Sequence, residues 1–474
     1  MKKRHLVLTA VFSLMTAALF ALPEVDTTQL LLSYIENNSE LKNLAIAVKK
    51  AALSYDSTKI DNGFDVTLSS GTITIKLAED GSTVTAKPSV QAKLPQASNL
   101  SAGVQANLSY NSNTAKVTDT AVSVGVDIIS AAGTTNRINL LKAERSLKEA
   151  ERKLGKYVLS VEKEFYTELK GLLSTISSIM TLENDYYTDK IDLEAKKIQG
   201  YSASSTTYRK AELKVISEEH EISSKLHSFI HDYVVFYKKC GYDIQLEDNP
   251  DLMELVPSDI EAGDPLNILD FNKEEYASIE NAKWTYKINS MERSANKNYS
   301  LSANAGYTFA NSTTKSDTVD AGLTGTVGGV SLGAGVSLPV GTDSMYPALT
   351  LSMSITPNTF RKNNIKKQQN DLTEEQELLA IETAEAEYET KIVETQQKLE
   401  SLLWEEKNIE ANVSMYEQLE KDMAQLYKMG YTSESEYLSA KTNLDSYIIK
   451  KIINQIELIM FNDDVVMNFV PQEM

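Results

Sequence analysis

Two stretches of the chain alternate apolar and polar residues with a period of two, the pattern of a half-exposed β-strand. The clearer one covers about 299–356, where Ser, Thr, Gly or Asn stand between the apolar positions. Its apolar runs are Leu301, Ala303, Ala305, Tyr307, Phe309; Val330, Leu332, Ala334, Val336, Leu338; and Leu349, Leu351, Met353, Ile355. Weak alternation of this kind is typical of transmembrane β-barrel strands.

The earlier counterpart covers about 64–129 and alternates in the same way, but it carries more charge. Between positions 299 and 357 only four residues are charged, namely Lys315, Asp317, Asp320 and Asp343. Eight of the twenty glycines of the chain also fall there, which favours turns and close strand packing. A soluble β-sandwich module is the alternative that these residues leave open.

Each strand stretch is followed by a long proline-free segment in which apolar residues recur every three or four positions, as in a helix. The first series is Leu154, Val158, Val161, Phe165, Leu169, Leu172, Ile176, Ile179 and Leu182. The second is Ile381, Ala384, Tyr388, Ile392, Thr395, Leu399, Leu402, Ile409, Val413 and Tyr416. Both series predict coiled-coil-like seams. From position 129 to 200 and from 355 to 430 the chain would form helices on the order of 100 Å long, which favours a tube or a spacer over a compact domain.

The sequence Gly-Tyr-Ser/Thr interrupts both long helices, at Gly200 and again at Gly430. Helical periodicity resumes after each interruption, to about Tyr237 and about Phe461. Glycine readily takes the positive φ that reverses a helix end, and a following Ser or Thr can cap the next helix. We therefore expect each glycine to form the tip of a helical hairpin. A glycine tolerated inside one continuous helix is the alternative.

The order of these elements is duplicated, which points to two structural repeats. A helical segment over 27–61 precedes the first strand stretch, and its part at 40–55 aligns loosely with 275–290, which precedes the second. Between the copies, Gln245 to Pro265 is acidic and punctuated by proline, as a linker would be. The sequence predicts an α+β protein with a first repeat over 22–242, a linker over 243–270 and a second repeat over 271–474.

The N-terminus has a basic start at Lys2, Lys3 and Arg4 followed by an apolar run that is shorter than the ~20 residues of a spanning helix. This pattern predicts a cleaved signal peptide over 1–21. No other segment is apolar enough for a helical membrane span, so contact with a bilayer would have to be made by strands. The only cysteine is Cys240, so we expect neither a lipid anchor at the cleavage point nor an intrachain disulfide.

The net charge of the chain is −19, and it becomes −22 when the three basic residues of the signal peptide are removed. A surface this acidic repels phosphate backbones, which argues against nucleic acid as a partner. His220, His227 and His231 could share one side of a helix, but a solvated helix face is the reading we favour over a zinc site. No catalytic or nucleotide-binding motif occurs, and we expect no enzyme activity, no metal and no cofactor.

Helix, strands, a ~70-residue helix, a glycine-centred tip and a return helix, all twice, resemble the TolC family of outer-membrane efflux proteins over Thr27 to about Phe461. The local motifs are Asn-Asn-Ser-Glu-Leu at 37–41 and the two tips. The resemblance implies a homotrimer with a shared β-barrel in outer-membrane lipid and a periplasmic α-helical barrel. It further implies a passive exit duct of a tripartite efflux or type I secretion system, docked to a periplasmic adaptor and an inner-membrane pump.

The resemblance also implies which tip residues have a function. Contact with the adaptor falls on Gly200, Tyr201, Ser202, Gly430, Tyr431 and Thr432. The family narrows its tube with acidic residues six and nine positions after the second tip glycine, where this chain has Glu436 and Ser439, with Glu434 nearby. We expect Glu434 and Glu436 to form an acidic entrance ring; a solvated first turn of a helix, which favours acids through the helix dipole, is the alternative.

A tyrosine and an aspartate of the family lock the tips together. Tyr427 matches the tyrosine, whereas Thr206 stands at the position of the aspartate and Thr432 at that of an arginine. The closed state is therefore expected to be held differently or less firmly. The family has two strands per half, and this chain offers about four alternating pieces per half. Either extra strands join the sheet or the hairpins extend beyond the membrane, and we expect twelve strands per trimer.

Two other classes of function fit parts of the pattern. A periplasmic adaptor would have a signal peptide and one helical hairpin flanked by lipoyl-like halves, and a surface adhesin or structural coiled coil would have long helices without conductance. The two tips and the two strand stretches favour the duct over both.

Overall fold

A computed structural model describes residues 26–76, 83–95, 99–111, 114–129, 132–295, 299–310, 316–341 and 346–470. The predicted signal peptide lies outside these residues. The chain divides into two compact units, one formed by 1–46, 151–277 and 387–474, the other by 47–150 and 278–386.

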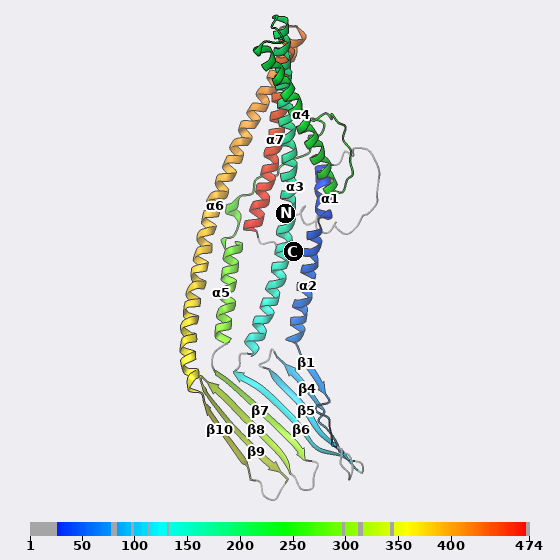
Figure 1. Ribbon diagram of the computed structural model, residues 1–474. Helices are drawn as coiled ribbons and strands as arrows, with labels where there is room; N and C mark the ends of the chain where they lie inside the picture. Colours follow the sequence, from blue (N-terminus) through cyan, green and yellow to red (C-terminus); the bar gives the residue numbers. More distant parts are fainter. Residues whose placement is uncertain are drawn as a thin grey trace. The chain divides into compact units, whose positions relative to one another are not determined.

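The second unit contains ten strands in one antiparallel sheet (Figure 1). In chain order they are β1 (Asp65–Ser69), β2 (Thr74–Lys76), β3 (Thr83–Ala86), β4 (Ser89–Leu94), β5 (Leu100–Asn111), β6 (Thr114–Ile129), β7 (Tyr299–Ala310), β8 (Asp317–Val327), β9 (Val330–Val340) and β10 (Ala348–Ile355). Both strand stretches of the sequence thus join a single sheet, with β6 of the first paired to β7 of the second. Among the described residues there is no second sheet to form the β-sandwich of the alternative reading.

The order across the sheet is β1-β4-β5-β6-β7-β8-β9-β10, with β2 and β3 beside this path. β3 and β4 both pair with β5 and are separated by Lys87 and Pro88, and β1 and β2 pair with β4 and β3 respectively. β1 with β2, and β3 with β4, therefore act as two strands of twelve residues with one interruption each. The described part of the chain contributes eight strand positions to one sheet, twice the four per chain that twelve strands per trimer would use.

The interruption in these two strands lies at the same level of the sheet. Gly71 has a φ of +64°, and a Cβ atom there would lie 2.0 Å from the carbonyl oxygen of Lys87. Pro88 cannot donate to the ladder, and its own carbonyl accepts a hydrogen bond of 2.9 Å from the backbone N–H of Ala106. Glycine and proline thus interrupt both strands, while β3 and β4 stay paired with β5 and β1 and β2 stay paired with β4 and β3.

The long helices match the predicted segments closely. They are α1 (Thr27–Asn37), α2 (Ser39–Asp61), α3 (Ala132–Ile198), α4 (Thr206–Lys239), α5 (Ala277–Ala295), α6 (Pro357–Lys428) and α7 (Glu434–Phe469). The helix expected over 27–61 is divided at Asn38, whose side-chain oxygen accepts from the N–H groups of Glu40 and Leu41. None of the described helices is both long and apolar enough to cross a membrane.

In the unit that contains the sheet, α3 and α5 are joined by a buried cation. The guanidinium of Arg145, on α3, forms ion pairs with Glu149 at 2.8 Å and with Glu280 of α5. It also lies 5.2 Å from the ring centroid of Trp284. Because the Arg145 side chain is 7% exposed, these carboxylates compensate a charge that would otherwise be costly to bury.

In the other unit, α3 lies between α4 and α7, which both run antiparallel to it (Figure 1). Contacts with α7 recur along the helix, from Lys163–Asp464 at 2.6 Å through Ser177–Ser446 at 3.0 Å. The predicted first seam is buried there at Leu154, Val161, Phe165, Leu169, Leu172, Ile176 and Ile179. At one end Tyr34 of α1 and Phe236 of α4 pack on Phe165, with ring centroids 5.6 and 5.2 Å from it.

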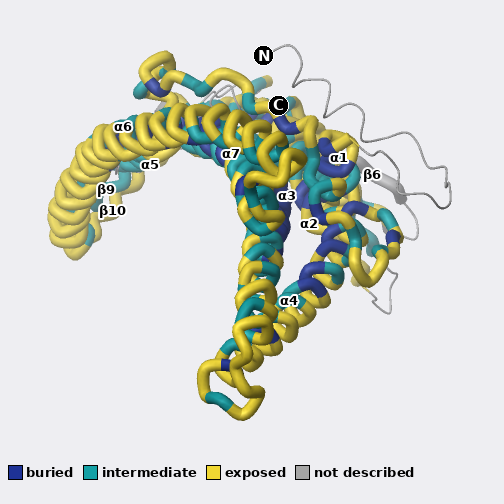
Figure 2. The backbone as a smooth tube through the Cα atoms, turned by 90° about the horizontal axis from the view of Figure 1, so that it is seen from above, coloured by how far each residue is buried: buried dark blue, intermediate teal, exposed yellow. Residues whose placement is uncertain are grey.

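α6 is exposed over most of its length (Figure 2). Its buried residues all belong to the predicted second seam, namely Ala384, Tyr388, Thr395, Leu402 and Ile409. Asp464 of α7 accepts from Lys398 of α6 at 3.1 Å as well as from Lys163, so one carboxylate joins three helices. The periodicity of the sequence therefore identified the buried face of both long helices.

The linker between the repeats lies against α7. The backbone N–H of Ala262 donates to the Gln455 side chain, and that of Leu266 donates to the Asn462 side chain, both at 2.9 Å. The amide of Asn462 donates in turn to the carbonyl of Asp264 at 3.4 Å. Short 3₁₀ turns at Ile268–Asp270 and Lys273–Glu275 then lead into α5. At 262–266 the linker is held through its backbone, whereas Asp259 accepts hydrogen bonds from Thr27 and the side chains of Ile260 and Ile268 are buried.

Candidate functional site at the two helix tips

Both tip glycines end a helix with the same hydrogen-bonded turn. Gly200 has a φ of +80° and Gly430 a φ of +74°. At the first tip the N–H of Gly200 donates to Lys197 and that of Tyr201 to Lys196; at the second, Gly430 donates to Tyr427 and Tyr431 to Leu426. This pair of bonds is the Schellman motif, which satisfies the last carbonyls of a helix and reverses the chain. Each glycine thus ends one long helix and reverses the chain toward the next, α4 or α7.

Serine residues begin the return helices. Ser205 accepts from the N–H of Tyr208 at the start of α4, and Ser433 accepts from that of Glu436 at the start of α7, both at 3.2 Å. The Glu436 carboxylate in turn accepts from the Ser433 N–H at 3.1 Å, which completes a capping box. The predicted capping thus occurs, although Ser202 and Thr432, which directly follow the Gly-Tyr pairs, are not the capping residues.

The two acidic residues predicted at the tip have different surroundings. The hydroxyls of Thr432 and Ser433 and the Ser433 N–H all donate to Glu436 and lower the pKa of its carboxyl group. Glu434 instead accepts from the phenol of Tyr187 on α3, and this hydrogen bond raises the pKa of Tyr187. The Glu436 carboxylate is therefore charged at neutral pH, and the side chains of both residues are held by neighbouring hydroxyl groups.

Contacts between α3 and α7 bring the second tip against the side of the first hairpin. The hydroxyls of Thr188 and Ser435 lie 3.2 Å apart. Ser435 is the second residue of α7, whereas α3 continues from Thr188 for ten more residues to Ile198. At about 1.5 Å per residue the first hairpin therefore projects roughly 15 Å beyond this contact.

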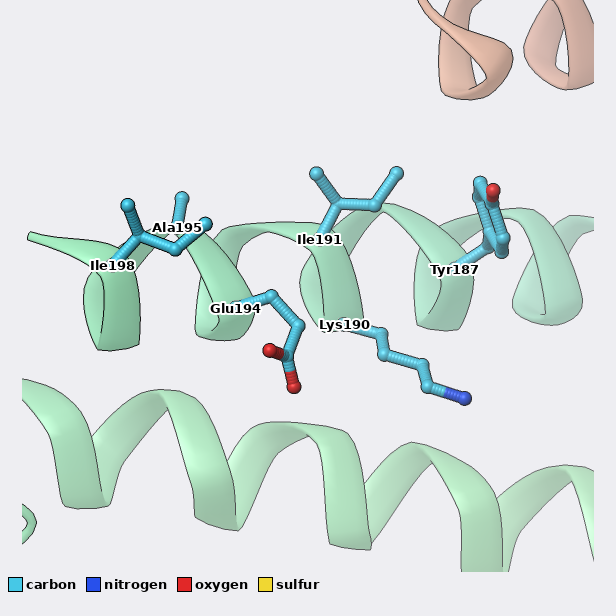
Figure 3. A pocket seen from close by; sticks show the side chains of 6 residues that line it. All are labelled: Tyr187, Lys190, Ile191, Glu194, Ala195 and Ile198. Atoms are coloured by element: carbon cyan, nitrogen blue, oxygen red, sulfur yellow. The ribbon is translucent and has the colours of Figure 1, made fainter.

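The projecting part of α3 has an open groove of about 380 Å³ lined by Tyr187, Lys190, Ile191, Glu194, Ala195 and Ile198 (Figure 3). In Figure 3 the side chains of Tyr187, Ile191, Ala195 and Ile198 stand on one side of the helix, while Lys190 and Glu194 point the other way. Ile191 is 42% exposed and Ile198 is 87% exposed. An apolar stripe at helical spacing is thus left uncovered at the first tip.

The two lock candidates, Tyr427 and Thr206, have separate surroundings in this structure. The ring of Tyr427 stacks on Tyr437 across the second hairpin, with centroids 5.6 Å apart and planes 5° from parallel. Thr206 is the first residue of α4. Hydrogen bonds among the described residues do not join Tyr427 to Thr206, so a lock between them stays a prediction for the assembled protein.

Sequence reasoning missed several members of this cluster, namely Tyr187, Thr188, Ile191, Ile198, Ser435 and Tyr437. The apolar spacing of four, four and three from Tyr187 through Ile191 and Ala195 to Ile198 continues the first seam and could have revealed the stripe. Another Gly-Tyr pair, Gly241-Tyr242, also ends a helix. It forms the same turn at the end of α4, but a Cβ at Gly241 would lie 2.5 Å from the Asn37 side chain, so this turn packs against the end of α1.

Elsewhere in the described residues, neither metal-binding side chains nor the cysteine form a second candidate site. The described part of the chain contains no group of three or more His, Cys, Asp or Glu residues that could hold a metal ion. Cys240 is buried, and burial raises the pKa of its thiol to about 12. The thiol is therefore protonated and unreactive at neutral pH.

Two family models match the chain. The TP096X N-terminal domain matches residues 30–260 and the TP096X C-terminal domain matches residues 261–472, so together they cover nearly all of it. No curated protein matches the sequence. The family boundary at 260/261 falls inside the predicted linker.

Solved structures share the fold at low identity. The MtrE outer membrane channel of Neisseria gonorrhoeae, in its open state, is 12% identical with a TM-score of 0.51, over 93% of this chain and 88% of that one. The CmeC outer membrane channel of Campylobacter jejuni is 13% identical with a TM-score of 0.44, over 97% and 94%. The outer membrane protein VceC of Vibrio cholerae is also 13% identical with a TM-score of 0.44, over 93% and 95%. The chain therefore belongs to the TP096X family, and it has the fold of the TolC-family outer-membrane channels.

Proposed function

We propose that the protein is the outer-membrane exit duct of a tripartite efflux or type I secretion system. In this proposal three copies share a β-barrel in the outer membrane, and their long helices form a periplasmic tube. The duct itself is passive. An inner-membrane pump supplies the energy, and a periplasmic adaptor biases the duct between closed and open states.

The observation that carries the proposal is the continuous apolar face of the sheet. Strand pairing aligns Val66, Ala92, Ala102, Val124, Ala305, Ala321, Val336 and Leu349 in one row across all eight strand positions. The row on the other face consists of Thr67, Gln91, Gly103, Ser123, Gly306, Asp320, Ser337 and Ala348. One side thus suits hydrocarbon and the other suits water, as in the wall of a transmembrane barrel.

The tips are the proposed contact with the adaptor. Each tip stands about 70 residues along one helix from the strands, which in a duct is the end away from the outer membrane. Tyr201 is 46% exposed and Tyr431 is 79% exposed, and the stripe from Tyr187 to Ile198 continues this surface. Apolar side chains at a projecting helix end suit the helical hairpin of a partner better than they suit water.

The acidic residues at the second tip are the proposed entrance ring. Three copies of Glu434 and Glu436 would place six carboxylates around a narrow lumen and raise the local concentration of cations. Glutamine also serves at the third position of a capping box, so Glu436→Gln removes the charge without removing the cap. The Glu434→Gln, Glu436→Gln variant should lose cation selectivity and block by divalent cations in planar bilayers while it keeps its trimer.

Cell fractionation and planar bilayers test the proposal together. The mature protein should fractionate with outer membranes, purify in detergent as a heat-dissociable trimer and form cation-selective channels. A soluble periplasmic monomer would favour an adaptor, and a surface-exposed trimer without conductance would favour an adhesin. Either result would overturn the proposed function.

A further inference from the structure

The sheet has two open edges, and their geometry matches. β1 at one end and β10 at the other are exposed at every residue. All seven pairings along the path from β1 to β10 are antiparallel, so β1 and β10 run in opposite directions. β10 of one copy placed beside β1 of another would therefore form an antiparallel pair like every other pair in the sheet.

Seven of the eight strand positions have the length of membrane strands, β10 is slightly shorter, and all eight have the alternating polarity. A tilted transmembrane strand needs about 9–11 residues, and the interrupted strands at 65–76 and 83–94 span twelve each. β5, β7, β8 and β9 have 12, 12, 11 and 11 residues, and β10 has 8. The apolar row extends through Val66 and Ala92 on the two outermost positions of the first half. These strands would expose apolar side chains to water if they stood outside the membrane.

We propose that copies of this chain close one wide barrel through β1 and β10, with eight strands from each copy. The inference rests on the proposed trimer, in which three copies give twenty-four strands. An open edge in hydrocarbon leaves a row of backbone donors and acceptors unsatisfied, and closure by a symmetric ring removes it. Each edge fits the opposite edge rather than itself, which is the head-to-tail arrangement that forms a closed ring.

The strand number fixes the width of the pore. Twenty-four strands about 4.8 Å apart and tilted about 40° give a backbone cylinder roughly 48 Å across, against roughly 24 Å for twelve strands. The lumenal face is lined mainly by Gly, Ser, Thr, Asn and Gln, with few bulky side chains to fill this space. A barrel this wide holds an aqueous channel that cannot discriminate among small solutes. Selectivity would then reside at the tips, and the barrel would pass whatever the tips admit.

Disulfide trapping tests the edge pairing in the full-length protein. Thr67 on β1 and Thr350 on β10 both belong to the polar face, so oxidant can reach them from the lumen. The Thr67→Cys, Thr350→Cys double variant should form disulfides between copies, up to a covalently linked trimer on denaturing gels. Thr67→Cys, Ser352→Cys tests the neighbouring register, and Thr67→Cys alone is the matched control. Cys240 is buried and does not compete.

A narrower barrel gives a different set of disulfides. If β1 to β4 stood outside the barrel, β5 would be the edge, and Ser101→Cys with Thr350→Cys would link copies while the Thr67 variants would not. If each chain closed its own eight-stranded barrel, the Thr67 variants would form disulfides within one chain. Either outcome overturns the wide barrel but leaves trimer formation and conductance, and hence the proposed duct, intact.

Electron microscopy of detergent-solubilised trimers provides an independent measurement of width. End-on views should show a ring roughly 48 Å in backbone diameter at the membrane end. A ring near 24 Å would refute the inference even if disulfides form. If the unmodified protein formed neither a trimer nor a conducting channel, the proposed function itself would be refuted.

Discussion

Replacing Gly430 should loosen the second tip by an amount that the backbone alone determines. A Cβ at Gly430 would have no neighbouring atom within 4 Å, so the cost of a substitution comes from its φ of +74° and not from a clash. For a residue other than glycine the left-handed region costs about 1–2 kcal/mol. We expect this cost for Gly430→Ala, a larger one for the β-branched Gly430→Val, and a smaller one for Gly430→Asn, because asparagine tolerates the region best.

Hydrogen exchange measures this change locally. The N–H groups of Gly430 and Tyr431 donate across the turn to Tyr427 and Leu426, both at 2.9 Å. Destabilisation by 1–2 kcal/mol should speed the exchange of the tip peptide about 5–30-fold. Gly171, in the interior of α3, is the matched control: a Cβ there also has open space, but its φ is helical. Gly171→Ala should stabilise its helix by about 0.5–1 kcal/mol.

The decisive result is that Gly430→Ala destabilises the protein while Gly171→Ala stabilises it. Equal exchange in wild type and Gly430→Val, or equal destabilisation by Gly430→Ala and Gly171→Ala, would refute the reasoning that positive φ holds the tip. The same variants then test export. Gly430→Val should impair export while the trimer still assembles, and normal export in both Gly430→Val and Gly200→Val would argue against adaptor contact at the tips.

Three further predictions concern the helices away from the tips. Burial by itself raises the pKa of Asp464, but hydrogen bonds from Lys163 and Lys398 outweigh it and lower the pKa. Asp464 therefore stabilises the folded protein above its unfolded pKa of about 4, and this contribution is lost as the pH falls through the lower folded pKa. The free energy of unfolding, measured as a function of pH, should show this loss in the wild type and not in Asp464→Asn. Arg145→Leu should lower the free energy of unfolding by about 3–5 kcal/mol, because it removes the guanidinium that pairs with Glu280, whereas Arg145→Lys should cost less. Denaturant titration measures both variants. Equal stability of Arg145→Leu and wild type would contradict the role of the buried ion pair. Cys240 should resist a thiol reagent at pH 8 in the native protein and react only as the protein unfolds; rapid labelling of the native protein would show that the thiol is not enclosed.

Much of the architecture could be predicted because each element has its own local signal. The first seam identified the buried face from Leu154 to Ile179, since a helix that packs on one side must repeat its apolar residues every three or four positions. Gly200 and Gly430 were recognisable because few other residues take their φ. The strand stretches alternated visibly because one face of the sheet is apolar and the other polar.

What the sequence could not supply depends on contacts between distant segments. The sequence offered about four alternating pieces per half, but it could not show that all of them join one sheet, because pairing between β6 and β7 joins residues about 180 positions apart. The difference between Gly241 and the two tip glycines likewise comes from Asn37, which lies about 200 positions away. Similarly, Glu434 and Glu436 look equivalent in the sequence, yet only the structure shows that Ser433 engages one and Tyr187 the other.

The attachment of the linker to α7 has a consequence for which positions can vary. Gln455 and Asn462 bind the backbone of Ala262, Asp264 and Leu266, and every residue type presents the same carbonyl and, proline apart, the same N–H. Substitutions in the linker at 261–266 should therefore leave its path unchanged, while a single change at Gln455 or Asn462 would release it. The specificity of this contact is encoded in the helix that receives the linker, and positions 261–266 are free to diverge as long as Ala262 and Leu266 keep an N–H group.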